Sequence, residues 1–233
     1  LTENYAIFFD LPMIFDLKLL EESPFPVRFD VESGARIGIM PRAGNNDDVR
    51  WFDIEPCYIF HTMNAYENSD NEIIIEGCRF ESIWADGFSP DTLPTAIPWQ
   101  WTLNLASGMG TERQLLDTVM DFPMIDLRKQ GRQHRVHYGL HLVEGSNDYP
   151  MHPDGILKHD RVSGADDSWI CGHAAQPDEP LFVPDPNDTG EDAGWLISMV
   201  YNRADDISEV VVLDAQELSK GPIARVKLPR RVP

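Results

Sequence analysis

The chain has 233 residues, and 19 Lys and Arg against 39 Asp and Glu give it a formal net charge of −20. This charge argues against nucleic acid as a partner and against docking on anionic lipid through a basic patch, because both need a clustered basic surface. Hydrophobic residues make up 42% and charged residues 25% of the chain, which are values of a globular protein with a buried core.

The cysteines and the apolar runs indicate the cellular compartment in which the protein is expected. Three cysteines, Cys57, Cys78 and Cys171, are too few and too scattered for a disulfide framework. No apolar run approaches the roughly 20 residues that a membrane-spanning helix needs. A reducing, cytoplasmic setting is therefore expected.

Short strand-like runs dominate the chain from its beginning to its end. They are rich in β-branched and aromatic residues and are separated by polar turns that contain Gly, Asn or Asp. The clearest runs cover residues 5–9, 26–30, 36–40, 57–60, 72–78, 155–159, 168–171, 195–201, 209–214 and 224–228. Repeated antiparallel pairs of this kind predict an all-β fold, a β-propeller or a β-sandwich. No linker divides the chain, so residues 1–233 are expected to form a single domain.

One segment has helical spacing. Leu115, Leu116 and Val119 recur at the period of a helix face, and the Asp121-Phe122-Pro123 stretch that follows would end a helix. The pattern predicts a short helix over residues 111–120.

Three histidines have the most metal-like spacing in the chain. On a helix, His134, His137 and His141 would share one face and could ligate zinc, which would make a zinc hydrolase an alternative. Residues 136–140 instead have strand composition, and a strand would place His137 and His141 on one face and His134 on the other. The polar face of a strand is the favoured interpretation.

A fourth histidine and two carboxylates have contexts typical of a site. His61 directly follows the apolar run 57–60, where the inner end of a propeller strand would face the central channel. The alternative is a lone histidine that bonds the backbone. Asp121 and Glu179 are flanked by apolar residues and prolines, so they need partners, such as the free ring nitrogen of a metal-bound histidine. The alternative for both is a surface turn.

Several strings in this chain, taken in order, resemble those of the carotenoid cleavage oxygenase family, which includes carotenoid, apocarotenoid and lignostilbene dioxygenases. They span essentially the whole chain. The matching strings are Thr2-Glu3-Asn4-Tyr5, Met40-Pro41-Arg42, Arg50-Trp51-Phe52, Phe60-His61-Thr62-Met63-Asn64-Ala65-Tyr66-Glu67, Glu179-Pro180-Leu181-Phe182-Val183-Pro184, Glu191-Asp192-Ala193-Gly194-Trp195-Leu196 and Leu213-Asp214-Ala215.

The resemblance implies a seven-bladed β-propeller with short helical insertions near its axis, where four histidines hold a non-haem Fe(II). His61 matches the third iron ligand of the family. Asp121 falls where the family has the Glu that braces this ligand, and Glu179 matches the Glu that braces the fourth. The other three ligands are expected outside this chain, which would then be a C-terminal half fragment with a partial propeller.

The implied activity is a dioxygenase reaction. A conjugated double bond of a carotenoid, apocarotenoid or stilbene-type substrate would be cleaved with O2 to give two carbonyl products. Phe60, Trp84 and Phe88 are candidates for the walls of the substrate tunnel, and core packing is the favoured alternative for each. A lipophilic substrate also implies a peripheral membrane contact through an apolar patch. The alternative function is a non-catalytic β-propeller that only binds.

Overall fold

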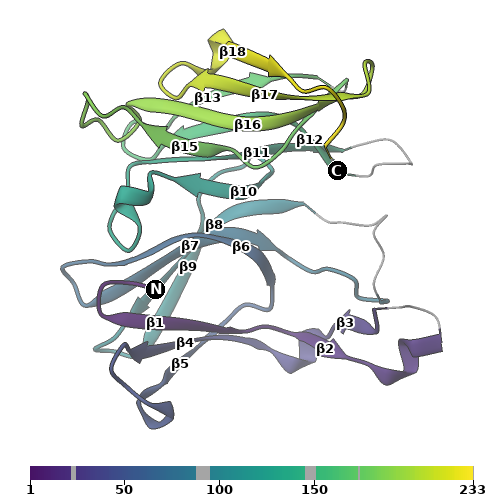
Figure 1. The fold of residues 1–233 in the computed structure, drawn as a ribbon. Coiled ribbons are helices and arrows are strands. Elements are labelled where there is room, and N and C mark those ends of the chain that lie inside the picture. The colour runs from purple at the N-terminus through teal and green to yellow at the C-terminus, as the bar shows by residue number, and fades with distance from the viewer. Residues whose placement is uncertain (22–24, 88–94, 145–150, 173, 233) are drawn as a thin grey trace. The chain divides into compact units, whose positions relative to one another are not determined.

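The computed structural model describes residues 1–21, 25–87, 95–144, 151–172 and 174–232 (Figure 1). Within these ranges the regular structure consists of antiparallel strands, and the only helices are short 3-10 turns. None of the helices in the described part of the chain is long and apolar enough to span a membrane. The all-β prediction is therefore confirmed.

The chain divides into two compact units. Unit 1 contains Leu1–Asp117 and Gly131–Gln133, and unit 2 contains Thr118–Gln130, His134–Gly145 and Met151–Pro233. Each unit is built from antiparallel sheets whose strands mostly follow one another along the chain, because short polar turns connect consecutive strands.

The described residues of unit 1 form three sheets and three 3-10 helices. The first sheet has the order β1-β4-β5, the second pairs β2 with β3, and the third has the order β6-β7-β8-β9. The bounds are β1 Tyr5–Asp10, β2 Met13–Phe15, η1 Leu17–Glu21, β3 Val27–Phe29, η2 Val31–Ser33, β4 Ala35–Pro41, η3 Asn46–Asp48, β5 Arg50–Ile54, β6 Tyr58–Glu67, β7 Glu72–Phe80, β8 Ala96–Asn104 and β9 Met109–Gln114.

The core of unit 1 joins the inner faces of its sheets. Ile37, Ile75 and Trp101 come from three different strands and have essentially no exposed surface. Cys57 and Cys78 are also fully buried, and all three cysteines of the chain are free thiols. Burial of these apolar groups supplies the main favourable free energy of folding.

In unit 2, the part of the chain that the structure describes forms two sheets and two 3-10 helices. One sheet has the order β10-β11-β12-β13, and the other has the order β14-β16-β17-β18 with β15 also paired to β16. The bounds are β10 Met120–Ile125, η4 Leu127–Lys129, β11 Val136–Glu144, β12 Met151–Asp160, β13 Ala165–Ile170, β14 Ala175–Pro177, β15 Leu181–Pro184, β16 Gly194–Asn202, β17 Ile207–Asp214, η5 Leu218–Lys220 and β18 Pro222–Lys227.

The core of unit 2 lies between its two sheets. Tyr138 on β11 stacks on Phe182 on β15, with ring centroids 5.6 Å apart and planes inclined by 12°. Leu196, Val211 and Leu213 are completely buried beside them. Their continuous apolar runs were expected to be strands, and the structure confirms them as β16 and β17.

The predicted helix over residues 111–120 is wrong. Its first part is β9, which pairs with β8 in the register Thr111 to Thr102 and Gln114 to Trp99, and β10 begins at Met120. The backbone N–H of Leu115 extends this pairing by donating to the carbonyl of Pro98. Leu115, Leu116 and Val119 form an apolar run too short to stabilise a helix. Pairing with β8 therefore prevails over the helical spacing in this segment.

Candidate functional site

His61 lies in a β-bulge of β6. Ile59 is paired with Arg79 and Thr62 with Gly77, so three steps along β6 correspond to two along β7. A second irregularity follows between Thr62 and Asn64. A bulge turns a side chain out of the regular alternation of a strand and is frequent beside active sites. The imidazole of His61 is partly buried.

An aromatic cluster, formed by Tyr58, Phe60, Phe80 and Trp84, lies beside this bulge. The ring of Phe60 meets the other three edge to face, with centroid distances of 4.8 Å to Tyr58, 5.3 Å to Phe80 and 5.8 Å to Trp84. It also lies 6.3 Å from the ring of His61 and is 41% exposed. The structure therefore brings together two of the predicted tunnel residues and the predicted metal ligand.

Trp84 has an unusual backbone conformation. Its φ of 47° lies in the left-handed region, which is uncommon for a residue with a bulky side chain. Its carbonyl accepts hydrogen bonds from the N–H groups of Phe29 and Gly87. These bonds hold the turn that places the indole against Phe60. The third predicted tunnel residue, Phe88, lies outside the described residues.

Asp121 lies in a second bulge, on β10. It is paired with Leu140, whereas Met124 is paired with Tyr138, so β10 has one extra residue. Asp121 is only 4% exposed, and Phe122 beyond it has a φ of 53°. A buried carboxylate next to a strained residue is a feature that clusters at functional sites. The surface-turn alternative is therefore wrong for Asp121, because its carboxylate lies within the sheet.

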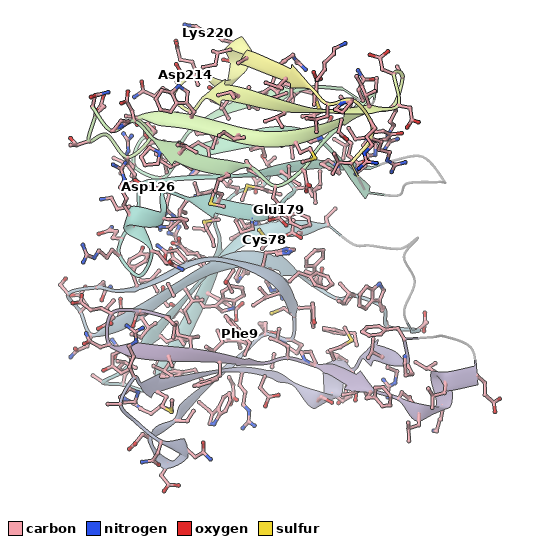
Figure 2. All side chains as sticks on the ribbon, in the orientation of Figure 1. Phe9, Cys78, Asp126, Glu179, Asp214 and Lys220 are labelled. Carbon is pink, nitrogen blue, oxygen red and sulfur yellow. The ribbon has the colours of Figure 1, made fainter. Side chains whose placement is uncertain are left out.

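Glu179 has a different environment. It lies on the connection between β14 and β15, where Figure 2 labels it, and it is exposed in this structure. Its backbone N–H donates to the carboxylate of Asp178, and the hydroxyl of Ser198 donates to the carbonyl of Asp178 at 2.6 Å. These two bonds fix the turn that carries the Glu179 side chain.

The two carboxylates belong to one region of unit 2. Their neighbours Phe122 and Asp178 both line a cavity of about 290 Å³, together with Met199. His61 belongs to unit 1. The roles that the resemblance implies for these three residues stay predictions.

Two of the three histidines with metal-like spacing lie on a strand, as predicted, but His137 is fully buried and does not lie on a polar face. His137 and His141 belong to β11, and His134 precedes it. The ring of His137 lies 6.1 Å from that of His134 and 5.1 Å from that of His159, a residue that the spacing did not single out. Within the ranges that the structure describes, no three His, Cys, Asp or Glu side chains are grouped so that they could hold a metal ion.

Burial keeps two of these histidines neutral. Desolvation, with a smaller contribution from Arg161, lowers the pKa of His134 to about 3. The pKa of His137 lies well below its ordinary value, again mainly because the ring is completely buried. These residues act as packed, uncharged rings of the unit 2 core.

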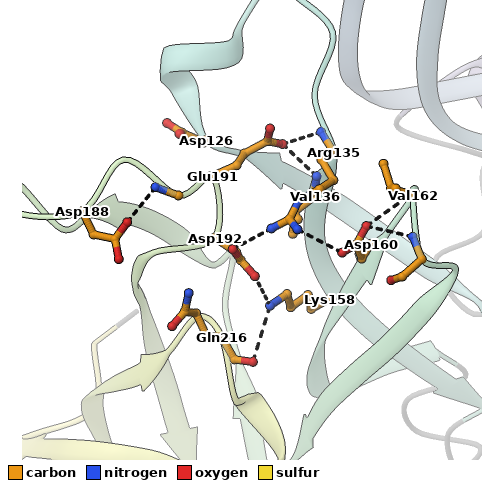
Figure 3. A network of polar contacts seen from close by, with 12 residues as sticks. Asp126, Arg135, Val136, Lys158, Asp160, Val162, Asp188, Glu191, Asp192 and Gln216 are labelled. Carbon is orange, nitrogen blue, oxygen red and sulfur yellow. Dashed lines mark hydrogen bonds and ion pairs between the residues drawn. The ribbon is translucent and has the colours of Figure 1, made fainter.

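The acidic pair Glu191 and Asp192 holds the connection between β15 and β16 against β11 and β12 (Figure 3). Glu191 accepts hydrogen bonds from the backbone N–H groups of Arg135 and Val136. Asp192 binds the guanidinium of Arg135 at 2.7 Å and the ammonium of Lys158 at 2.8 Å. Burial opposes ionisation of Asp192, but these partners outweigh it and lower its pKa. This acidic motif therefore has a structural role.

Two polar side chains of β6 were not among the site residues predicted from the sequence. Asn64 and Glu67 follow His61 at intervals of three residues, and both bond segments far away in the sequence. The available signal was their polarity within an otherwise apolar strand, but their partners could not be read from the sequence.

Comparison with known proteins settles the family. A family model described as retinal pigment epithelial membrane protein matches residues 1–233. The chain belongs to this family, that of the carotenoid cleavage oxygenases. The resemblance seen in the sequence is confirmed.

Carotenoid cleavage oxygenases from plants and bacteria are among the similar proteins. A carotenoid 9,10(9′,10′)-cleavage dioxygenase of Crocus sativus is 33% identical over 100% of this chain and 46% of its own length. The lignostilbene-α,β-dioxygenase isozyme III of Sphingomonas paucimobilis is 34% identical over 100% of this chain and 51% of its own length. The chain thus spans about half the length of the curated relatives it matches.

Solved structures of a carotenoid cleavage oxygenase match the fold. The apocarotenoid oxygenase of Synechocystis, in a form with a Glu-to-Asp substitution, superposes with a TM-score of 0.86 at 27% identity, over 100% of this chain and 50% of that one. A cobalt-substituted form of the same enzyme gives a TM-score of 0.85. The fold therefore matches half of that enzyme.

Proposed function

We propose that the whole protein is a non-haem Fe(II) dioxygenase that cleaves a conjugated double bond of a carotenoid, apocarotenoid or stilbene-type substrate with O2. The observation that carries this proposal is the imidazole of His61, held in a bulge beside the aromatic cluster. Relatives named as carotenoid and lignostilbene dioxygenases support the reaction class.

The proposed architecture is a seven-bladed β-propeller, with residues 1–233 as part of a single domain. The four-stranded antiparallel sheets of both units are consistent with propeller blades. The match to half of the apocarotenoid oxygenase supports the same arrangement.

The residues of this chain fit a part of an iron site. Imidazole is a suitable ligand for iron, and the bulge leaves the ring of His61 partly exposed. His61 would supply one ligand, and the remaining ligands would come from the rest of the protein. Asp121 and Glu179 would orient ligand imidazoles through their free ring nitrogens, as carboxylates commonly do around metal-bound histidines. When bound, the iron would activate O2 for oxidation of the double bond.

Positioning of the substrate would be the task of the aromatic cluster. The exposed part of Phe60 offers an apolar ring face, and its three neighbours restrict how that ring can turn. A flat conjugated chain packs well on such rings, and this contact excludes water from the reacting bond. Trp84 would line the same wall, and we retain Phe88 as a further candidate.

An exposed apolar patch supports a peripheral membrane contact for a protein that we place in the cytoplasm. Phe15 is 63% exposed, Leu17 66%, Leu20 55% and Phe25 51%, and all four lie on or beside the β2-β3 hairpin. Side chains of this kind can enter the interface of a bilayer without a basic surface. The patch would admit a lipophilic substrate from the membrane.

A non-catalytic binding module is the second candidate function. The replacement of a bracing Glu by the shorter Asp121 favours it, because a misplaced carboxylate would weaken the iron site. Iron content separates the two functions.

The test uses the full-length protein and a His61→Ala variant. We expect the unmodified protein to bind about one Fe(II) and the variant to lose both iron and activity, because an iron ligand is removed. Metal analysis and mass spectrometry of the products from β-carotene, an apocarotenal and a lignostilbene measure both. His159→Ala is the control, since it removes an imidazole outside the proposed site. Unchanged iron and activity in His61→Ala would refute the proposal.

A further inference from the structure

β6 is irregular where it carries His61. The two irregularities, between Ile59 and Thr62 and between Thr62 and Asn64, interrupt the pairing with β7 on both sides of Thr62. A bulge bends its strand and increases the local twist, so the direction of the His61 side chain depends in part on what holds β6 after the second bulge.

The first anchor is Asn64, which is only 7% exposed. Its side-chain amide donates to the carbonyl of Arg132 at 2.9 Å, and its side-chain oxygen accepts from the backbone N–H of Gly131 at 3.1 Å. Both bonds join β6 to a segment more than sixty residues further along the chain. One amide thus satisfies a donor and an acceptor of the same loop, which fixes that loop in one register.

The second anchor is Glu67. Its Oε1 accepts from the hydroxyl of Thr2 at 2.7 Å and from the backbone N–H of Asn4 at 2.8 Å, and its Oε2 accepts from the side-chain amide of Asn4 at 3.0 Å. The Thr2 hydroxyl in turn accepts from the N–H of Tyr5 at 3.0 Å, where β1 begins. Both oxygens of this carboxylate are therefore used to hold the N-terminal segment.

Charge strengthens this second anchor. Burial disfavours the ionised carboxylate, but the hydrogen bonds from Asn4 and Thr2 together outweigh burial and lower the pKa of Glu67. Hydrogen bonds to an ionised acceptor are stronger than those between neutral groups. Thr2 itself is only 3% exposed, so this residue of the N-terminal segment is also buried within unit 1.

We propose that Asn64 and Glu67 are positioning residues for His61, forming a polar clamp with Thr2, Asn4 and the segment 131–132. The clamp joins two distant segments, residues 2–4 and 131–132, to the strand that carries the imidazole, directly after the bulges. This inference rests on the proposed function, in which His61 is an iron ligand.

The donor and acceptor pattern of the clamp provides a sharp test in the full-length protein. Asn4→Asp puts a carboxylate against Glu67, so the side-chain donor is lost and two like charges meet. Adding Glu67→Gln to that variant restores one donor and one acceptor at the same place. We expect Asn4→Asp to weaken Fe(II) binding roughly 10-fold, as loss of an outer contact of a metal site does, and the double variant to recover it.

The readouts are the Fe(II) dissociation constant from an anaerobic chelator competition, the melting temperature, and kcat and KM separately. We expect kcat to fall and KM to change little in Asn4→Asp, because no wall of the substrate site is altered. Asn64→Asp tests the other anchor, since it loses the donor to Arg132, and it should shift Fe(II) binding in the same direction. The matched control is Glu72→Ala, which removes a carboxylate that accepts from Asn68 at the turn end of the same hairpin.

The outcomes separate this inference from the proposed function. Weaker Fe(II) binding in Asn4→Asp, recovery in the double variant and unchanged Fe(II) binding in Glu72→Ala support the clamp. Loss of iron in His61→Ala with unchanged affinity in Asn4→Asp overturns the positioning role alone. A lowered melting temperature without a change in Fe(II) binding overturns it too. Retention of iron in His61→Ala overturns the proposed function itself.

Discussion

The bulges on β6 and β10 are similar in position but differ in what surrounds them. Each lies on the first strand of a four-stranded sheet and carries a predicted site residue, His61 or Asp121. Each is also opposed by a glycine on the next strand, Gly77 or Gly139. In β6 the strand after the bulge is held by the side-chain hydrogen bonds of Asn64 and Glu67, whereas the bulge of β10 is marked by a buried Asp121 and by the left-handed backbone of Phe122.

The two side chains have different surroundings. A metal ligand must point in one direction while part of its ring stays accessible, so anchors beyond the bulge are useful. Asp121 is instead buried inside unit 2. The two bulges should therefore respond differently to acid and to added volume.

A fall in pH should have the largest effect on stability, and it should destabilise unit 2. The pKa of His134 is lowered to about 3 and that of His137 lies well below 6.5, in both cases mainly by desolvation. The unfolded chain binds protons on these rings below pH 6.5 and the folded unit does not, so the stabilisation present above pH 6.5 is lost as the pH falls toward 3. The loss approaches about 1.4 kcal/mol per pH unit for each histidine.

Hydrogen exchange at pH 7.0 and pH 5.5, read peptide by peptide, measures this effect. Peptides of β11 and β12 should lose protection at pH 5.5, while those of β7 and β8 should change less. A His134→Gln variant should reduce the pH dependence. Equal losses in both units would contradict the comparison.

Gly139→Ala should have the next largest effect. Its new Cβ would lie 2.6 Å from Cγ and Sδ of Met120 and 3.1 Å from the carbonyl of Asp121. Met120 is fully buried, so it has no open space to move into. We expect unfolding in urea to show a loss of about 2 kcal/mol, typical of overpacking a core. A loss below the error of the measurement would mean that the β10 bulge is not packed tightly.

Gly77→Ala should have the smallest effect on stability but a selective one on the metal. Its Cβ would lie 3.0 Å from the carbonyl of His61 and 3.3 Å from Cα of Thr62, so the backbone of the bulge must shift by a few tenths of an ångström. We expect urea unfolding to show a loss of about 1 kcal/mol in the free energy of unfolding, at the low end of overpacking costs. The Fe(II) affinity of the full-length protein should fall as well. If Gly139→Ala lowers iron affinity and Gly77→Ala does not, the roles assigned to the two bulges are reversed.

Local patterns were enough to predict the strands but not the segment before β10. The apolar runs that became β16 and β17 are long and rich in Val and Ile, so their composition alone identifies them as strands, although one face of each is buried and the other only partly so. Leu115 and Leu116 misled the prediction because apolar residues at a strand end and in the following turn can imitate a helical period. Only pairing with β8, which is a non-local interaction, decides the outcome.

The aromatic neighbours of His61 could be predicted from the sequence, but the geometry around it could not. The string around His61 identifies the family, and Phe60 and Trp84 do meet beside it. The bulge could not be predicted, because it is a mismatch between two strands and depends on the register of both. The partners of Glu67 were equally hidden, since they lie more than sixty residues away in the sequence.

The buried thiols of unit 1 have a practical consequence. A thiol is oxidised as its thiolate, and desolvation raises the pKa of Cys57 to about 11, while Cys78 has no exposed surface at all. Neither residue should react with peroxide or an alkylating reagent while unit 1 is folded. The rate at which a thiol reagent labels them would therefore measure how often the core of unit 1 opens.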